Sequence, residues 1–269
     1  MDWPGIVRRV AAAVLGAAIC GWLSTLAPTA GQADAAAARN GRDAQRPPEP
    51  TPKPKPPPPD CTRVKCVALT FDDGPAQSTG RLLDILAARD VRATFFLIGE
   101  NAAQHPDLVR RQHAAGPEIA DHSYTHSDLG RASKQKILSE LTRTQDAIRR
   151  ASGVKPVMLR PPYGATSKRL TEITRQLGLA QVLWTVDPLD WEHRDAGSVE
   201  RRVLKSVKPG HIVLLHDIHP STVRAVPKII DSLAAQGYVF VTVPELFGGR
   251  LTPGEEYVRL NSGDAQGLP

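Results

Sequence analysis

The sequence predicts an α/β fold with about seven parallel strands, and a (β/α) barrel of seven units fits this pattern. From Cys66 onward, short apolar runs alternate with longer segments of helical spacing, which is typical of a parallel sheet with crossover helices. The apolar runs are continuous, as expected for strands that are covered on both faces. The chain has 269 residues, 41% of them hydrophobic, which is enough to bury a full core. An open doubly wound sheet fits the same pattern.

The predicted elements follow one another without internal repeats. Strands are predicted at 67–71, 92–98, 118–120, 157–159, 180–186, 211–215 and 238–243. Helices are predicted at 82–89, 106–115, 134–150, 167–177, 198–207 and 223–236. Pro106 suits the first turn of its helix, and Gly178 and Gly237 follow the last turns of two others. In either fold, chemistry is expected where strands end and loops begin.

The N-terminal region predicts export and a spacer. Arg8 and Arg9 precede a largely apolar run over 10–27, and Ala33-Asp34-Ala35 has the small residues of a cleavage site. An uncleaved membrane anchor is the alternative. The predicted boundaries are a signal peptide at 1–35, a Pro-rich disordered linker at 36–60, a folded domain at 61–250 and an irregular C-terminal tail at 251–269. We therefore expect a secreted or wall-associated protein.

Charge and cysteines narrow the class of protein. The formal net charge of +6 suits loose attraction to anionic partners such as cell-wall polymers. The sequence has no nucleic-acid motif and no dense run of Lys and Arg beside aromatics, so we expect no nucleic-acid partner. Outside the reducing cytosol, Cys61 and Cys66 can close a short disulfide loop. A metal-binding pair is the alternative, although no further soft ligands lie nearby.

Two adjacent carboxylates end the first predicted strand. Asp72 and Asp73 occur in the segment Thr70-Phe71-Asp72-Asp73-Gly74-Pro75. Where a strand passes into a loop, both side chains can turn into one pocket. Neighbouring carboxylates repel, so a bound cation or a nearby Arg would favour both being ionised. Asp-Gly-Pro is also common turn chemistry, which is the competing interpretation.

A pair of histidines follows the third predicted strand. His122 and His126 are four residues apart, which places them on one face of a helical turn where they can share a metal. A third carboxylate ligand would leave a position open for water. The Glu of the usual metalloprotease motif is absent. Alone, two histidines at this spacing are a weak signal, since they can also be unrelated surface or cap residues.

Three further strand ends carry polar or aromatic groups. Arg160 begins Arg160-Pro161-Pro162-Tyr163-Gly164 and can pair with a pocket carboxylate or with an ordinary surface partner. Trp191 ends Asp187-Pro188-Leu189-Asp190-Trp191 and can form a wall against a sugar ring or pack in the core. His216, in Leu214-Leu215-His216-Asp217, can act as a general acid or be a hydrogen-bonded buried histidine. Five such segments at five strand ends favour one shared site.

Taken together and in order, these five segments resemble the five motifs of the polysaccharide deacetylase family, also called the NodB-homology domain. The resemblance covers about residues 64 to 248 and is specific as a set. It implies a distorted barrel and a divalent metal, Zn²⁺, with other ions such as Co²⁺ as alternatives. It further implies that Asp72 is the catalytic base and His216 the acid, and that Asp73, His122 and His126 bind the metal.

The same resemblance implies supporting roles around the reacting atoms. Arg160 would hold the base by an ion pair, and the backbone N–H of Tyr163 would help to bind the oxyanion. Asp190 would either orient Arg160 or tune the acid. Trp191 and Leu214 would line the acetyl pocket.

The resemblance implies a metal-dependent hydrolase that cleaves amide bonds. The expected reaction is removal of N-acetyl groups from N-acetylglucosamine units of peptidoglycan or a chitin-like glycan. Alternatives are an O-deacetylase of acetylated xylan and a non-catalytic glycan-binding domain on the same fold. The acetylated glycan is the expected partner of a monomeric protein, with membrane contact only through the N-terminal segment if that segment stays uncleaved.

Overall fold

A computed structural model of the chain describes residues 57–249 and 251–261. The predicted signal peptide at 1–35 and most of the linker at 36–60 lie outside the described residues, as do residues 262–269 of the predicted tail. Among the described residues, no helix is both long enough and apolar enough to cross a membrane.

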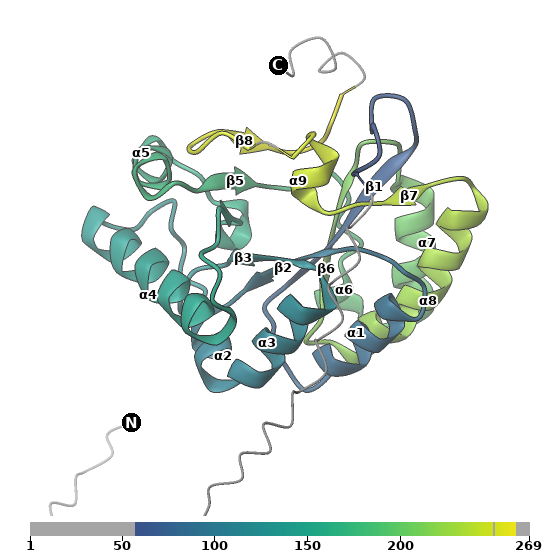
Figure 1. Cartoon of the computed structure of the whole chain (residues 1–269), viewed down its shortest axis with the longest axis horizontal. Coiled ribbons are helices and arrows are strands. Elements are labelled where there is room, and N and C mark those ends of the chain that lie inside the picture. Colours follow the sequence, from purple (N-terminus) through teal and green to yellow (C-terminus); the bar gives the residue numbers. More distant parts are fainter. Residues whose placement is uncertain (1–56, 250, 262–269) are drawn as a thin grey trace, which may run out of the picture. The chain divides into compact units, whose positions relative to one another are not determined.

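A curled parallel sheet forms the centre of the described domain (Figure 1). Its strands are β1 (Cys66–Asp72), β2 (Thr94–Leu97), β3 (Glu118–Asp121), β4 (Met158–Leu159), β5 (Ala180–Val182), β6 (Ile212–His216), β7 (Val239–Phe240) and β8 (Glu256–Tyr257). The order is β6-β1-β2-β3-β4-β5-β8, and β7 pairs with the first residues of β1. All of these pairings are parallel. All seven predicted strands therefore occur, and the predicted α/β barrel-like fold is confirmed.

The sheet curls until its two sides approach each other. Beyond β5, Val186 forms a parallel bridge with Val213 of β6. The N–H of Leu214 donates to the carbonyl of Val186 over 2.9 Å. Because β6 also pairs with β1, this bridge links the fifth strand back to the first. The carboxyl ends of the strands are thus gathered around one opening.

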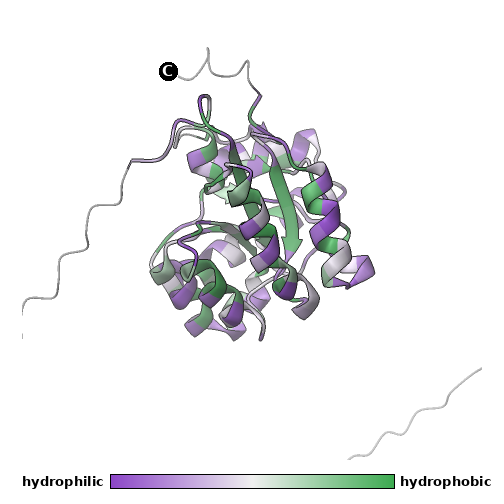
Figure 2. Ribbon diagram, turned by 90° about the vertical axis from the view of Figure 1, so that its right-hand side faces the viewer, coloured by the Kyte–Doolittle hydropathy of each residue, from purple (hydrophilic) through white to green (hydrophobic). Residues whose placement is uncertain are grey.

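Helices surround the sheet (Figure 1). They are α1 (Thr79–Ala87), α2 (Gly99–Gln104), α3 (Pro106–Ala115), α4 (Lys134–Ser152), α5 (Lys168–Leu177), α6 (Asp190–His193), α7 (Ala196–Ser206), α8 (Pro220–Ala235) and α9 (Val243–Leu246), with a 3₁₀ turn at Pro162–Gly164. In Figure 2 the strands are mostly hydrophobic, whereas the helices carry residues of both kinds. The main core packs β1, β2 and β6 against the apolar faces of the helices.

Two features differ from the sequence prediction. The short helices α2, α6 and α9 were not predicted, because four to six residues are too few to establish a helical period. The segment after Leu251 was expected to be irregular, but its described part contains the short strand β8. There β8 pairs with β5, Tyr257 packs on Phe247, and Leu260 is buried.

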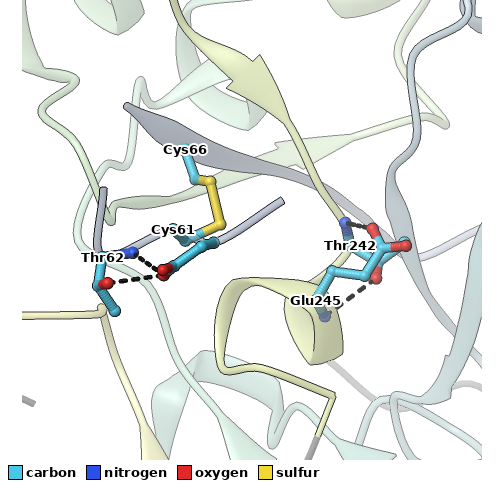
Figure 3. The surroundings of a disulfide bond; sticks show 6 residues. Cys61, Thr62, Cys66, Thr242 and Glu245 are labelled. Atoms are coloured by element: carbon cyan, nitrogen blue, oxygen red, sulfur yellow. Dashed lines mark hydrogen bonds between the residues drawn. A yellow bond between two sulfur atoms is a disulfide. The ribbon is translucent and has the colours of Figure 1, made fainter. Parts of the chain in front are cut away.

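The predicted disulfide between Cys61 and Cys66 is confirmed (Figure 3). The two Cα atoms are 5.3 Å apart, and Cys66 is the first residue of β1. A metal-binding pair at these positions is therefore excluded. Close by in Figure 3, Thr242 and Glu245 form a capping box that begins α9. Both features lie at the amino end of β1, away from the polar residues that follow Phe71.

Candidate active site

A cavity of about 540 Å³ opens at the carboxyl ends of the strands. Most of the predicted site residues line it. The lining consists of Asp72, Asp73, His122, His126, Pro161, Tyr163, Trp184, Asp187, Trp191, Leu214 and His216. Arg160 and Asp190 are fully buried behind this wall. Five segments that are far apart in the sequence therefore meet at one place.

Three of the lining residues can hold a cation. Asp73 Oδ1 lies 3.4 Å from Nε2 of His122 and 3.5 Å from Nε2 of His126. One ligand atom from each residue falls within 4.8 Å of the others. Oδ1 of Asp73 is buried and has no hydrogen-bond partner among the described residues, as a metal ligand would. Two imidazole nitrogens and a carboxylate oxygen are the donors that Zn²⁺ takes at catalytic sites, so the residues fit this ion.

The second nitrogen of each imidazole is held in place as well. Nδ1 of His122 lies 2.7 Å from the carbonyl oxygen of Arg160, and Nδ1 of His126 lies 3.1 Å from the hydroxyl of Tyr163. Such contacts fix the orientation of a metal-binding imidazole. Burial raises the pKa of Asp73, but the neighbouring imidazoles, first of all that of His122, outweigh this and bring that pKa to about 2. Asp73 is therefore ionised across the physiological range.

The segment that carries both histidines is not helical, which corrects the expectation of a helical turn. It is an irregular loop after β3, with φ of 64° at Ser123 and 56° at His126. These left-handed residues turn the chain sharply enough for the rings to approach. The two ring centroids lie 5.0 Å apart. The sequence spacing thus indicated the correct pair for the wrong local reason.

Asp72 is held by a buried ion pair. Nη1 of Arg160 lies 2.7 Å from Oδ1 of Asp72, and both side chains are almost inaccessible to solvent. The same guanidinium donates to Oγ1 of Thr70 and to the carbonyls of Val182 and Leu183. Burial lowers the pKa of Arg160, although Asp72 opposes this shift. A carboxylate beside the cation triad is thereby fixed, with its second oxygen 3.7 Å from Nε2 of His122.

His216 is held by Asp190. The carboxylate of Asp190 accepts from the backbone N–H of His216 over 2.8 Å and lies 2.9 Å from its Nδ1. Burial lowers the pKa of His216, but the hydrogen bond and charge of Asp190 outweigh it and raise that pKa to about 9. Of the two arrangements expected for Asp190, the structure therefore has the one in which it contacts the imidazole. A protonated imidazole at neutral pH can donate a proton.

Aromatic and apolar side chains complete the wall. Trp191 is 46% exposed, so it is not a core residue, and Leu214 is buried beside it in the same cavity lining. Tyr163 is 70% exposed and has a φ of 61°, in the 3₁₀ turn after Arg160. Trp184, which the sequence analysis did not single out, also lines the cavity. Together these groups form an apolar part of the cavity lining, next to the carboxylates and imidazoles described above.

Two buried carboxyl groups that support the site were also missed. Glu140 of α4 accepts hydrogen bonds from the loop between the two histidines. Its signal was available, because it stands three residues after Ile137 on the buried face of the helix, where an apolar residue is expected. Asp217 follows His216, accepts a hydrogen bond from Thr79, and burial raises its pKa to about 7.

Comparisons with known proteins agree with this geometry. The family model described as Polysaccharide deacetylase matches residues 60–182, which include the first three of the five segments. Peptidoglycan-N-acetylglucosamine deacetylase PgdA of Listeria monocytogenes is 41% identical over 194 residues, which are 72% of this chain and 41% of that protein. The match thus spans less than half the length of this relative.

Two further proteins extend the comparison. A bifunctional xylanase/deacetylase of Pseudobutyrivibrio xylanivorans is 40% identical over 72% of this chain and 32% of its own length. The solved structure described as T48 deacetylase with substrate is 43% identical, with a TM-score of 0.71 over 74% of this chain and 98% of that one. The chain belongs to the polysaccharide deacetylase family.

Proposed function

We propose that this protein is a metal-dependent deacetylase that removes N-acetyl groups from N-acetylglucosamine units of peptidoglycan. The observation that carries the proposal is the convergence of three kinds of group in one cavity. These are the Asp73, His122 and His126 cation triad, the carboxylate of Asp72, and the imidazole of His216. Metal-assisted amide hydrolysis uses a cation site, a base and an acid.

In this proposal the chain's own residues move two protons. Asp72 takes a proton from the attacking water as the water oxygen bonds to the acetyl carbon. The backbone N–H of Tyr163 donates to the oxyanion that forms on the carbonyl oxygen. His216 then gives its proton to the sugar nitrogen as the C–N bond breaks, which leaves acetate and a free amine. A bound Zn²⁺ would polarise the carbonyl and lower the pKa of water.

The neighbours of these groups suit the assigned roles. Arg160 keeps Asp72 oriented toward the cavity through a 2.7 Å ion pair. Asp190 favours the protonated form of His216, which an acid catalyst requires at neutral pH. Trp191 and Leu214 offer an apolar surface for the acetyl methyl group and the sugar ring.

Peptidoglycan is preferred as substrate on two grounds. PgdA of Listeria monocytogenes is named for peptidoglycan N-acetylglucosamine. The signal peptide and Pro-rich linker predicted at 1–35 and 36–60 suit a secreted or wall-facing enzyme. We propose Zn²⁺ as the metal, with Co²⁺ as a functional substitute, and a monomer as the working form.

Acetylated xylan is the second candidate, because the relative from Pseudobutyrivibrio xylanivorans combines a xylanase with a deacetylase. Acetate release from peptidoglycan, chitooligosaccharides and acetylxylan at matched acetyl concentration separates the two. We expect release from the first two, with loss in chelator and recovery on adding Zn²⁺. Release from acetylxylan alone would favour the second candidate. A chelator-insensitive protein that binds glycan without releasing acetate would contradict both.

A further inference from the structure

Glu140 lies outside the five segments that form the site, yet it contacts the loop that carries both histidines. It is in the middle of α4, and only 1% of it is exposed. Oε2 of Glu140 accepts from the backbone N–H groups of Tyr124 and Thr125, each over 2.8 Å. Its Oε1 accepts from the hydroxyl of Thr125 over 3.0 Å. The carboxylate thus holds the two peptide groups midway between His122 and His126.

A single neighbouring cation balances the charge of this buried carboxylate. Nζ of Lys136 lies 2.7 Å from Oε1 of Glu140, one helical turn away. Burying a carboxylate is costly unless it is paired and hydrogen-bonded. Glu140 satisfies both conditions, and each of its loop contacts is to a residue between the two histidines.

The loop needs external contacts, because its own conformation is unfavourable. Ser123 and His126 both have left-handed φ values, which are unfavourable for residues with a side chain. The N–H of Ser123 donates to Oδ1 of Asp121 over 2.7 Å. Three consecutive N–H groups, at Ser123, Tyr124 and Thr125, are therefore held by two carboxylates.

The carbonyl groups of the same loop are held from the other side. The N–H of Gly99 donates to the carbonyl of Ser123 over 2.9 Å, and that of Glu100 donates to the carbonyl of Tyr124 over 3.0 Å. Gly99 begins α2, and a side chain there would come within 2.6 Å of both Tyr124 and Thr144. The loop is thus clamped between α2 and α4, with Glu140 as its contact on α4.

We propose that Glu140 is a positioning residue for the divalent cation site, since it fixes the peptide that sets the separation of the two imidazoles. This inference rests on the proposed function. It assigns a role in metal affinity to a residue of α4 that does not itself line the cavity. Its action is geometric, so the length of the side chain matters more than its charge.

Two substitutions separate length from charge. Glu140→Gln keeps the length and an acceptor for both N–H groups but removes the charge. Glu140→Asp keeps the charge but is one methylene too short to reach them. Zn²⁺ affinity, measured by competition with a chromophoric chelator in the absence of substrate, should fall about 10- to 100-fold in Glu140→Asp and Glu140→Ala. Glu140→Gln should lose clearly less. Glu172→Ala, at an exposed position of α5, is the matched control and should be unchanged.

The outcomes distinguish this inference from the proposed function. A wild-type protein that binds no Zn²⁺ would overturn both. Normal binding by the wild type together with equal affinity in Glu140→Asp would overturn this inference alone, as would a Gln variant weaker than the Asp variant. If Glu140→Ala does not fold, the near-isosteric Gln and Asp variants still decide the matter. A purely structural role would lower the melting temperature in chelator and leave the Zn²⁺ affinity unchanged.

Discussion

The two sides of the cavity both pair opposite charges, but they are built differently. The Asp72 side (Thr70, Asp72 and Arg160) joins the end of β1 to the residue after β4 across the barrel. The His216 side (Asp190, His216 and Thr222) joins the end of β6 to the short helix α6. Asp72 and His216 both line the cavity, but the Asp72–Arg160 pair is closer to complete burial than the His216–Asp190 pair.

The two sides therefore differ in what they affect. The Asp72 side bears on the stability of the fold, and the His216 side bears on the pKa of an imidazole. The guanidinium of Arg160 donates hydrogen bonds to four residues, Thr70, Asp72, Val182 and Leu183. It also lies 4.1 Å from the ring centre of Phe96. The Asp72 side therefore connects β1 to the chain around β5 and should contribute to the stability of the fold. The His216 side is more local, and its main effect is on the pKa of one imidazole.

The largest contrast is expected in catalysis. Asp72→Asn should lower kcat/KM about 10²- to 10⁴-fold on amide and ester substrates alike, because both reactions need the base. His216→Asn should have a similar effect on an amide but a smaller one on an acetyl ester, since an alkoxide leaves without prior protonation more easily than an amine. Kinetics on matched N- and O-acetyl substrates, with Zn²⁺ binding as a control, test this. Asp72→Asn with normal turnover would refute the assigned base.

Next in size is the effect on stability. Arg160→Met leaves Asp72 buried without its counter-charge, and breaking a buried pair in this way costs about 3–5 kcal/mol. Asp190→Asn keeps acceptors for His216 and should cost less, about 1–3 kcal/mol. The free energies of unfolding in urea, measured in chelator, compare the two. Equal losses would mean that the two sides do not differ as described.

The pH dependence of stability tests the contribution of the His216 side. The pKa of His216 is raised from 6.5 to about 9, with Asp190 as the cause of the rise. Their pairing therefore stabilises the fold fully below pH 6.5, and this contribution is lost as the pH rises through about 9. In Asp190→Asn the imidazole should titrate at lower pH, and stability should fall less over that interval. NMR titration of His216 in chelator-treated protein measures the shift, and an unchanged pKa would contradict it.

A smaller effect on stability is expected at Gly74, which lies against Asp217 between the two sides. Asp217 follows His216, and a side chain at Gly74 would come within 2.5 Å of its carboxylate oxygens. Gly74→Ala should therefore destabilise the protein by about 1–3 kcal/mol and weaken Zn²⁺ binding through the neighbouring Asp73. Gly153→Ala is a control with open space but a left-handed φ of 79°. It should affect stability without affecting Zn²⁺ affinity.

The smallest contrast comes from a matched pair of buried threonines. Thr70 accepts from Arg160 and donates to the carbonyl of Val213, whereas Thr222 donates only to Asp190. Thr70→Val should cost about 1–3 kcal/mol, because a charged donor and a buried carbonyl both lose a partner. Thr222→Val should cost about 0.5–1.5 kcal/mol. Thermal unfolding of both variants gives the order, and the reverse order would contradict the contrast between the sides.

The strands of the fold could be predicted from the sequence because they are continuous apolar runs. Val67 to Phe71 and Ile212 to Leu215 are buried throughout, so their pattern has few competing interpretations. The short helix α6 was missed because its four residues follow a left-handed residue, Leu189, in a polar segment. Such local turns are set by the contacts around them.

The residues of the site also fall into those that the sequence could predict and those that it could not. Strand-end residues such as Asp72 and His122 could be predicted, because parallel strands bring their carboxyl ends together. The choice between the two partners expected for Asp190 could not be made, since α6 directs its side chain toward His216 only in the folded chain. Glu140 is 14 residues beyond His126 in the sequence, and only the packing of α4 brings it to the loop.

The short strand β8 also protects the protein outside its site. It lies against β5, where the N–H groups of Gln181 and Leu183 donate to the carbonyls of Glu255 and Tyr257, each over 2.8 Å. Without the segment 251–261, these groups would form an exposed sheet edge, which is a template for adding a strand from another molecule. The C-terminal segment thus guards against edge-to-edge aggregation, and a chain that ended at residue 250 would be prone to it.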